Sequence, residues 1–600
     1  MFARTHVARA LGAPLLLAAS LGGCDPAPGP APNVGVPPST AGATQGPHED
    51  PVEKQVARLR QPETRAGAVS RLARLFEEAM ERDEQSLEGP TVERLLDRIV
   101  SPLNEACVAG GLDRTTTSAL LGLLHDARRP EGGPCLVKAL RDYVPDSTEE
   151  DVRWAARAVR VMRLRSAAGP LFEVFTKMKP SRPKAGAVYR DVYDAMLVLS
   201  DPSWEPALIA NLDRPVTDWR SRESQIDEVQ WSTVTSAKLL GELRSEKAVP
   251  ALLRVMLTPD KADAHMTCVL ALLKAGKPAS AAAIALLEGK DKEMVRYSEA
   301  EAARGYGQSI TADQKKEAAG AHVATAALVL ATIGREESRA PLLAAIKSAG
   351  DVARAIIARE LPKVPRSADT VKAFQAVFEK TPLSLTLPPA GQNALESLLD
   401  VAPTFFDASL VPWLIKVAGT VKGDEEDVAA FKETALIAMM KMMRADQLAA
   451  VEKFAAGKTL GADGEPSTVG KALERELSQS RALLQACGDK VECYMDRLAD
   501  PTSQDDKTLF TGIKAMYMVG ALGSPAVKGK LVARMPGLKN AALRGLAASV
   551  IDFHSPKGDA ETAGELQRIV DAVEATKDPA LMATQSHFRY TIHRLQARAQ

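Results

Sequence analysis

The chain has 600 residues, 46% of them hydrophobic, which suffices for several cores or for one long array of repeated units. Lys plus Arg and Asp plus Glu each number 76, which excludes a general electrostatic attraction to nucleic acid or to an anionic membrane. Aromatic residues make up only 4% of the chain, and this scarcity favours stacked helices over β-sheets.

The first residues have the pattern of an export signal. A basic start precedes a short apolar run at 11–19, which is shorter than the ~20 residues that a membrane-spanning helix needs. The tetrapeptide LGGC at 21–24 resembles a bacterial lipobox, which implies cleavage before Cys24 and lipidation of its sulfur. The alternative is an ordinary secretory signal with an incidental cysteine. We expect a signal peptide at 1–23 and a periplasm-facing, membrane-anchored protein, with the inner or outer membrane left open.

The rest of the chain divides by composition into a tether and two arrays. Residues 24–51 are rich in proline, glycine and small polar residues, so we expect a disordered tether with nothing to bury. Helical periodicity then fills 52–380 and 390–600, which we interpret as an N-terminal and a C-terminal array of helices. The Pro/Leu-rich segment at 382–389 is the predicted junction between them, and the polar helix at 585–600 is expected to cap the stack.

A regular spacing of prolines marks the repeated unit in the first array. Pro134, Pro170, Pro206 and Pro250 each stand at the start of a short apolar helix, at intervals of 36, 36 and 44 residues. Proline is tolerated in the first turn of a helix because the N–H groups there have no intrahelical partner. The intervals are close to the ~40–47-residue period of two-helix repeats.

Residues 231–257 show one such unit most clearly, as two amphipathic helices joined by a polar turn. Val234, Ala237 and Leu240 share a face of the first helix, and Pro250 begins the second. The segments LGEL at 240–243 and VPAL at 249–252 resemble a HEAT repeat, and the segments at 333–343 and 519–523 share parts of the pattern. The resemblance implies an all-α fold, an α-solenoid of stacked antiparallel helix pairs of the HEAT/armadillo-like type.

Four of the cysteines are predicted to form disulfides, because the expected compartment is oxidising. Gly488 ends one helix and Cys493 begins the next, so the sulfurs of Cys487 and Cys493 meet across the turn. Cys107 and Cys135 are predicted to form a second bridge between neighbouring helices. Cys268 lies on an apolar helix and is interpreted as a buried free thiol.

The sequence contains no recognisable catalytic, metal-binding or phosphate-binding motif, so we predict neither catalysis nor a cofactor. His125-Asp126 is interpreted as a surface pair and not as a catalytic dyad. The methionines at 439–443 are interpreted as core filling and not as a copper(I) site, because no His or Cys accompanies them.

One basic stripe is the candidate binding element. Arg153, Arg157 and Arg160 fall on one face of a predicted helix, where they are able to recognise an acidic partner or simply form the solvated side. Solenoids act by presenting long surfaces to other proteins, so we predict a scaffold or adaptor in the bacterial envelope that binds protein partners. Neither nucleic acid nor a small-molecule substrate is expected. The alternatives are a HEAT-like enzyme of the lyase type and a passive spacer.

Overall fold

A computed structural model describes residues 50–178, 185–215, 228–306, 311–387, 391–456, 468–499, 508–576, 582 and 585–600. Contacts between residues divide the chain into two compact units, whose described residues lie within 50–243 and 244–600. We call these the N-terminal unit and the C-terminal unit. The predicted signal peptide, the lipidation site Cys24 and nearly all of the tether lie outside the described residues.

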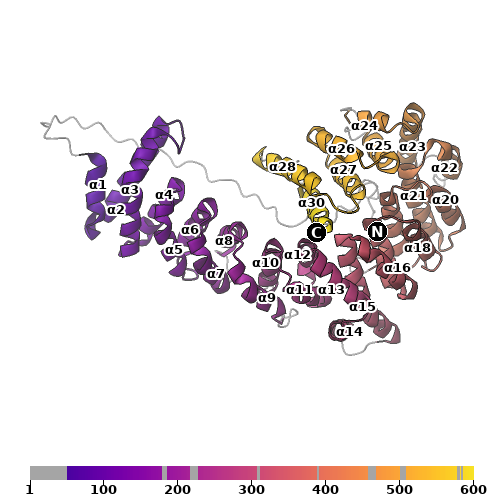
Figure 1. Ribbon diagram of the computed structural model, residues 1–600, viewed down its shortest axis with the longest axis horizontal. Coiled ribbons are helices and arrows are strands. Elements are labelled where there is room, and N and C mark those ends of the chain that lie inside the picture. The colour runs from indigo at the N-terminus through magenta and orange to yellow at the C-terminus, as the bar shows by residue number, and fades with distance from the viewer. Residues whose placement is uncertain are drawn as a thin grey trace. The chain divides into compact units, whose positions relative to one another are not determined.

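The N-terminal unit consists of helices stacked in two layers. Its helices are α1 (Pro51–Leu59), α2 (Arg65–Arg82), α3 (Pro90–Ala109), α4 (Arg114–Ala127), α5 (Gly133–Arg141), α6 (Glu149–Met162), α7 (Ala168–Lys177), α8 (Ala185–Leu199), α9 (Glu205–Asp213) and α10 (Glu228–Glu242) (Figure 1). In the first layer α4 packs on α6, α6 on α8, and α8 on α10. In the second layer α3 packs on α5, and α5 on α7. The chain is therefore an α-solenoid, as the sequence predicts.

A recurring turn links the two layers. After α4, Arg128 adopts a left-handed backbone conformation, with φ of 51°, and ends the helix. A short 3-10 turn follows, and Pro134 then lies in the first turn of α5. Arg163 and Pro170 repeat this arrangement between α6 and α7. The predicted spacing of prolines is thus confirmed. Each of these prolines lies in the first turn of a helix, where its missing N–H costs little because N–H groups there have no intrahelical acceptor.

The C-terminal unit continues the stacking over a longer stretch. Its helices are α11 (Val249–Leu257), α12 (His265–Ala275), α13 (Lys277–Leu287), α14 (Lys292–Tyr306), α15 (Ala312–Ile333), α16 (Arg339–Ser348), α17 (Asp351–Glu360), α18 (Ala368–Phe378), α19 (Ala394–Val401), α20 (Leu410–Thr420), α21 (Glu425–Met442), α22 (Leu448–Ala455), α23 (Thr468–Cys487), α24 (Val491–Ala499), α25 (Leu509–Leu522), α26 (Val527–Arg534), α27 (Ala541–Phe553), α28 (Ala560–Thr576) and α30 (Gln585–Ala599). The methionines at 439, 440, 442 and 443 are buried in its core.

The division between the units lies elsewhere than the predicted junction. Residues on both sides of 382–389 belong to the C-terminal unit, where α17 packs on α19. In its described part β1 (Thr386–Leu387) pairs antiparallel with β2 (Gln392–Asn393), and Leu387 packs with Ala355 and Ala394. The stretch 231–257, with the strongest repeat pattern, instead contains the boundary at 243/244.

The C-terminal unit closes on itself. One series of helices makes successive contacts in the order α12, α15, α17, α19, α21, α25, α27 and α30, and α30 in turn packs against α12 (Figure 1). The polar helix at 585–600, which we expected to cap the stack, packs against both α27 and α12. A closed cycle has no exposed terminal repeat at α30, so this unit differs from an open array.

Two buried arginines of α30 form the closing contact. Arg594 Nη1 donates to the carbonyl of Ala331 at 2.7 Å and also to that of Thr332, and Arg598 Nε donates to that of Ile333 at 3.3 Å. These carbonyls end α15, where no intrahelical N–H reaches them. Both guanidinium groups also pair with Asp552 of α27, at 3.1 and 2.7 Å. The cationic helix α30 thus joins the C-terminal ends of two helices.

In this cluster two guanidinium groups share one carboxylate. Burial acts to raise the pKa of Asp552, but the guanidinium groups of Arg594 and Arg598 outweigh it and lower that pKa below its usual value. Gly334, with φ of +68°, allows the close approach, because a Cβ there would lie 2.6 Å from Arg594 Nη2. Of the helices described, none is long and apolar enough by itself to cross a membrane, although the bent pair Pro259–Ala275 and Lys277–Leu287 passes that test jointly.

Candidate protein-binding surface

The predicted arginine stripe lies on α6 and faces the next helix of its layer. Arg153 Nε and Arg157 Nε lie 3.3 and 3.0 Å from the same oxygen of Asp191 on α8. Arg160 Nη1 lies 2.9 Å from Asp194, one turn further along α8. The three arginines therefore share a face, as their spacing predicts, but acidic groups of α8 already neutralise them. This face therefore does not present an unpaired cationic stripe to an acidic partner.

These ion pairs connect neighbouring repeats and contribute little energy individually. The side chains of Arg153, Arg157 and Arg160 remain 28%, 32% and 42% exposed, so water and salt screen their pairs to about 0–1 kcal/mol each. Asp191 is only 11% exposed and bonds two arginines, which fixes the position of α6 relative to α8. The exposed edges of the guanidinium groups keep N–H donors available to a partner.

An aromatic contact extends this surface toward α4. The ring of Trp154 lies 5.4 Å from that of His125, and the guanidinium of Arg157 lies over Trp154 at 5.5 Å. The indole packs close to α4 at Gly122, where a Cβ would lie 3.7 Å from the Trp154 ring, an ordinary van der Waals distance. His125 Nδ1 is 2.8 Å from Asp126. This pair belongs to the packing around Trp154, which agrees with its interpretation as a surface pair.

A second aromatic contact extends the surface toward α10. The rings of Tyr189 and Tyr193 stack at 6.1 Å on α8, and the Tyr189 hydroxyl is 2.7 Å from that of Thr235. Lys238 Nζ lies over the Tyr193 ring at 4.7 Å. Burial raises the pKa of both phenols, so they remain neutral hydrogen-bonding groups.

Together these side chains form a partly exposed row across α4, α6, α8 and α10, which we call the ladder. Its members are His125, Trp154, Arg157, Asp191, Tyr193 and Lys238. Trp, Tyr and Arg are the residue types that most often dominate the binding energy of protein interfaces. Arg157 of the ladder was predicted from the sequence, together with Arg153 and Arg160 beside it. The aromatic members were missed, although Trp154 stands three residues before Arg157 and Tyr189 four before Tyr193.

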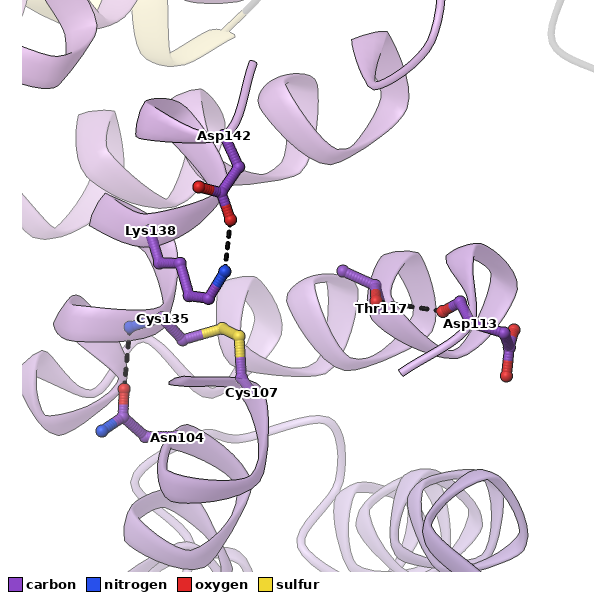
Figure 2. Close-up of a disulfide and its surroundings, with 7 residues drawn as sticks. All are labelled: Asn104, Cys107, Asp113, Thr117, Cys135, Lys138 and Asp142. Atoms are coloured by element: carbon purple, nitrogen blue, oxygen red, sulfur yellow. Dashed lines mark hydrogen bonds and ion pairs between the residues drawn. A yellow bond between two sulfur atoms is a disulfide. The ribbon is translucent and has the colours of Figure 1, made fainter. Parts of the chain in front are cut away.

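The structure contains both predicted disulfides. Cys107 at the end of α3 is bonded to Cys135 of α5, with their Cα atoms 5.6 Å apart, and the Cys135 N–H donates to Asn104 Oδ1 (Figure 2). Cys487 at the end of α23 is bonded to Cys493 of α24 across the turn that contains Gly488. Cys268 is buried as a free thiol, and its burial raises the pKa of the sulfur.

Within the described ranges, no group of three or more His, Cys, Asp or Glu side chains is placed to hold a metal ion. The ladder itself contains a single carboxylate, which two guanidinium groups occupy. Its chemistry therefore consists of aromatic surface and of N–H and O–H donors. These groups are suited to contact with another macromolecule.

No protein-family model and no curated protein matches this chain. A comparison with solved structures finds distant likenesses. A crystal structure of importin beta is 12% identical, covers 90% of this chain and 79% of its own, and gives a TM-score of 0.37. Kap121p bound to the SUMO protease Ulp1p is 13% identical over 92% of this chain and 67% of its own, with a TM-score of 0.24. Kap121p bound to Nup53p is 13% identical over 90% of this chain and 66% of its own, with a TM-score of 0.25. We draw no functional conclusion from such distant likenesses.

Proposed function

We propose that this protein is a non-catalytic adaptor of the bacterial envelope, anchored in a membrane through a lipid on Cys24, which binds a partner protein through the ladder. The proposal combines a site predicted from the sequence with a surface described in the structure. An adaptor needs a stable surface on which contact residues are held in position. The stacked helices of the N-terminal unit supply such a surface.

The ladder is the observation on which the proposal rests. Aromatic residues make up only 4% of this chain, yet Trp154, Tyr189 and Tyr193 are partly accessible on one layer of one unit. Each ring is held by a neighbour on the next helix, so little conformational entropy remains to be lost on binding. Partly accessible rings occur elsewhere too, as at Phe172, but here three of them lie on two neighbouring helices of one layer.

The two disulfides support export to an oxidising compartment, because such bonds persist mainly outside the cytosol. Export and the lipobox-like segment at 21–24 are consistent with each other. Lipid attachment at Cys24 is tested by mass spectrometry of the membrane fraction. The expected result is an acylated N-terminal peptide that begins at Cys24, together with release of a Cys24→Ser variant from the membrane.

The binding role is tested by removing the ladder rings. We expect the variant Trp154→Ala with Tyr193→Ala to lose at least about 2 kcal/mol of partner binding, or about 30-fold in affinity, because truncating interface hot spots costs this much. Phe172→Ala is the matched control, since Phe172 is a half-buried ring of α7 in the other layer. Affinity is measured with the partner identified by cross-linking in intact cells, and thermal unfolding checks each variant. Equal binding by both variants would contradict the proposal.

A further inference from the structure

A separate open groove of about 520 Å³ lies along α5 of the N-terminal unit. It is lined by Pro130, Pro134 and Val137 from the α5 region, Val108 from the end of α3, and Leu164 and Ser166 from the turn after α6. The ladder residues do not line it. Its volume falls within the range of ligand-binding clefts and is suited to a few side chains of a docked segment.

The floor of the groove is apolar and accessible. Val108, which lines the groove, is 45% exposed. Single exposed valines are ordinary on a protein surface, but Val108 here adjoins two prolines and Leu164 within one concavity. Water in this groove therefore contacts mainly hydrocarbon, and an apolar side chain that displaces it gains about 25 cal/mol per Å² of buried area.

The rim of the groove is cationic. Lys138 and Asp142 line it and pair with each other (Figure 2), so they contribute no net charge. Arg141 also lines the groove, and Arg165 stands between the lining residues Leu164 and Ser166. Both arginines are exposed, and neither pairs with a carboxylate anywhere in the described part of the chain. The guanidinium of Arg141 thus borders an apolar floor, and the exposed Arg165 is the chain neighbour of two lining residues; such groups complement carboxylates.

The disulfide holds one wall of the groove. Cys107 directly precedes Val108, and Cys135 lies between Pro134 and Val137 on α5 (Figure 2). The bond fixes the end of α3 against α5, and the Asn104 side chain adds a 2.8 Å hydrogen bond to the Cys135 N–H. The groove is therefore formed before any ligand arrives, which reduces the entropy lost on docking.

We propose that this groove docks a short segment of the partner protein, in which one or two apolar side chains are flanked by Asp or Glu. The apolar side chains occupy the floor beside Val108, and the carboxylates pair with Arg141 and Arg165. This inference rests on the proposed adaptor function and specifies a second contact with the same partner. Acidic groups of the partner are thus expected to bind Arg141 and Arg165, because the arginines of α6 already pair with Asp191 and Asp194.

The test uses a defined probe, a fluorescein-labelled peptide with two leucines flanked by four aspartates, measured by fluorescence anisotropy against the full chain. Binding is expected to weaken at least tenfold in Val108→Glu and in the double variant Arg141→Glu, Arg165→Glu, and to weaken with added salt. The controls are Val161→Glu and Arg74→Glu, which change exposed residues outside the groove and are expected to bind as the unaltered protein does. A peptide with lysine in place of aspartate is expected not to bind.

Absence of binding, or equal binding by the groove variants and their controls, would overturn the inference. The adaptor function is assessed separately, because partner binding that depends on Trp154 and Tyr193 is measured without this peptide. If that binding persists while the peptide fails to bind, the groove proposal alone is wrong. If the peptide binds at the groove but no partner depends on the ladder, the ladder proposal is wrong instead.

Discussion

Replacing Arg594 by Met is expected to open the cycle of helices in the C-terminal unit. The substitution retains much of the side-chain volume but removes the guanidinium that reaches Ala331, Thr332 and Asp552. The carbonyls that end α15 then lose their donor, and they lie where water does not readily replace it, since the Arg594 side chain is only 2% exposed.

The magnitude follows from the burial of the pair. Breaking a buried ion pair by removing one partner costs about 3–5 kcal/mol. Asp552 is 18% exposed and keeps its bond to Arg598, so the lower end of this range applies. We expect the free energy of local opening at the closure to fall by about 3 kcal/mol, which corresponds to exchange on the order of 150-fold faster for amides that open there.

Hydrogen exchange measured by mass spectrometry provides the assay, on peptides that cover 265–276 and 331–335. Arg589→Met is the matched control, because Arg589 lies on the same helix and pairs with Glu574 at an exposed site. Loss of the exposed Arg589–Glu574 pair is expected to change the free energy of local opening by only about 0–1 kcal/mol. If protection at 265–276 and 331–335 is the same in both variants, Arg594 does not hold the closure, and the reasoning fails.

Two further predictions concern the disulfides and one histidine. Replacing Cys107 and Cys135 by Ser is expected to lower the free energy of unfolding by about 3.5 kcal/mol, and replacing Cys487 and Cys493 by about 2 kcal/mol, because the bonds close loops with sequence separations of 28 and 6. Urea unfolding measures both, and equal losses would contradict the loop-length argument. Burial lowers the pKa of His554, so its neutral form is favoured in the folded state. The contribution of His554 to the free energy of unfolding is therefore fully present above its unfolded-state pKa of about 6.5 and is lost as the pH falls below that value. Urea unfolding at a series of pH values is expected to show a smaller loss of stability in His554→Asn.

The helix pairs were predictable because their signals are local. An apolar face at helical spacing and a proline in the first turn each depend on a few adjacent residues, and Pro134 and Pro170 begin helices as expected. The closure of the C-terminal unit has no such signal. Arg594 bonds carbonyls that stand 262 and 263 residues earlier in the chain, and backbone carbonyls carry no residue-specific mark in a sequence.

The candidate site was predicted in part for a similar reason. The spacing of Arg153 and Arg157 correctly gives a shared face, but both guanidinium groups pair with Asp191, which belongs to the following helix of the same layer. Matching acidic and basic residues between successive helices of a layer would have revealed these pairs. At 382–389 the Pro/Leu-rich composition suggested a junction, but in the described part of this segment Leu387 is buried with Ala355 and Ala394 within one unit.

Site-specific photo-cross-linking in intact cells tests the central claim most directly, namely that the ladder is the partner-binding surface. A photo-reactive phenylalanine analogue is placed at position 154, 193 or, as the control in the other layer, 172. The ladder account predicts that positions 154 and 193 yield the same discrete cross-linked protein and that position 172 does not. Equal yields at the three positions, or none at 154 and 193, would contradict it.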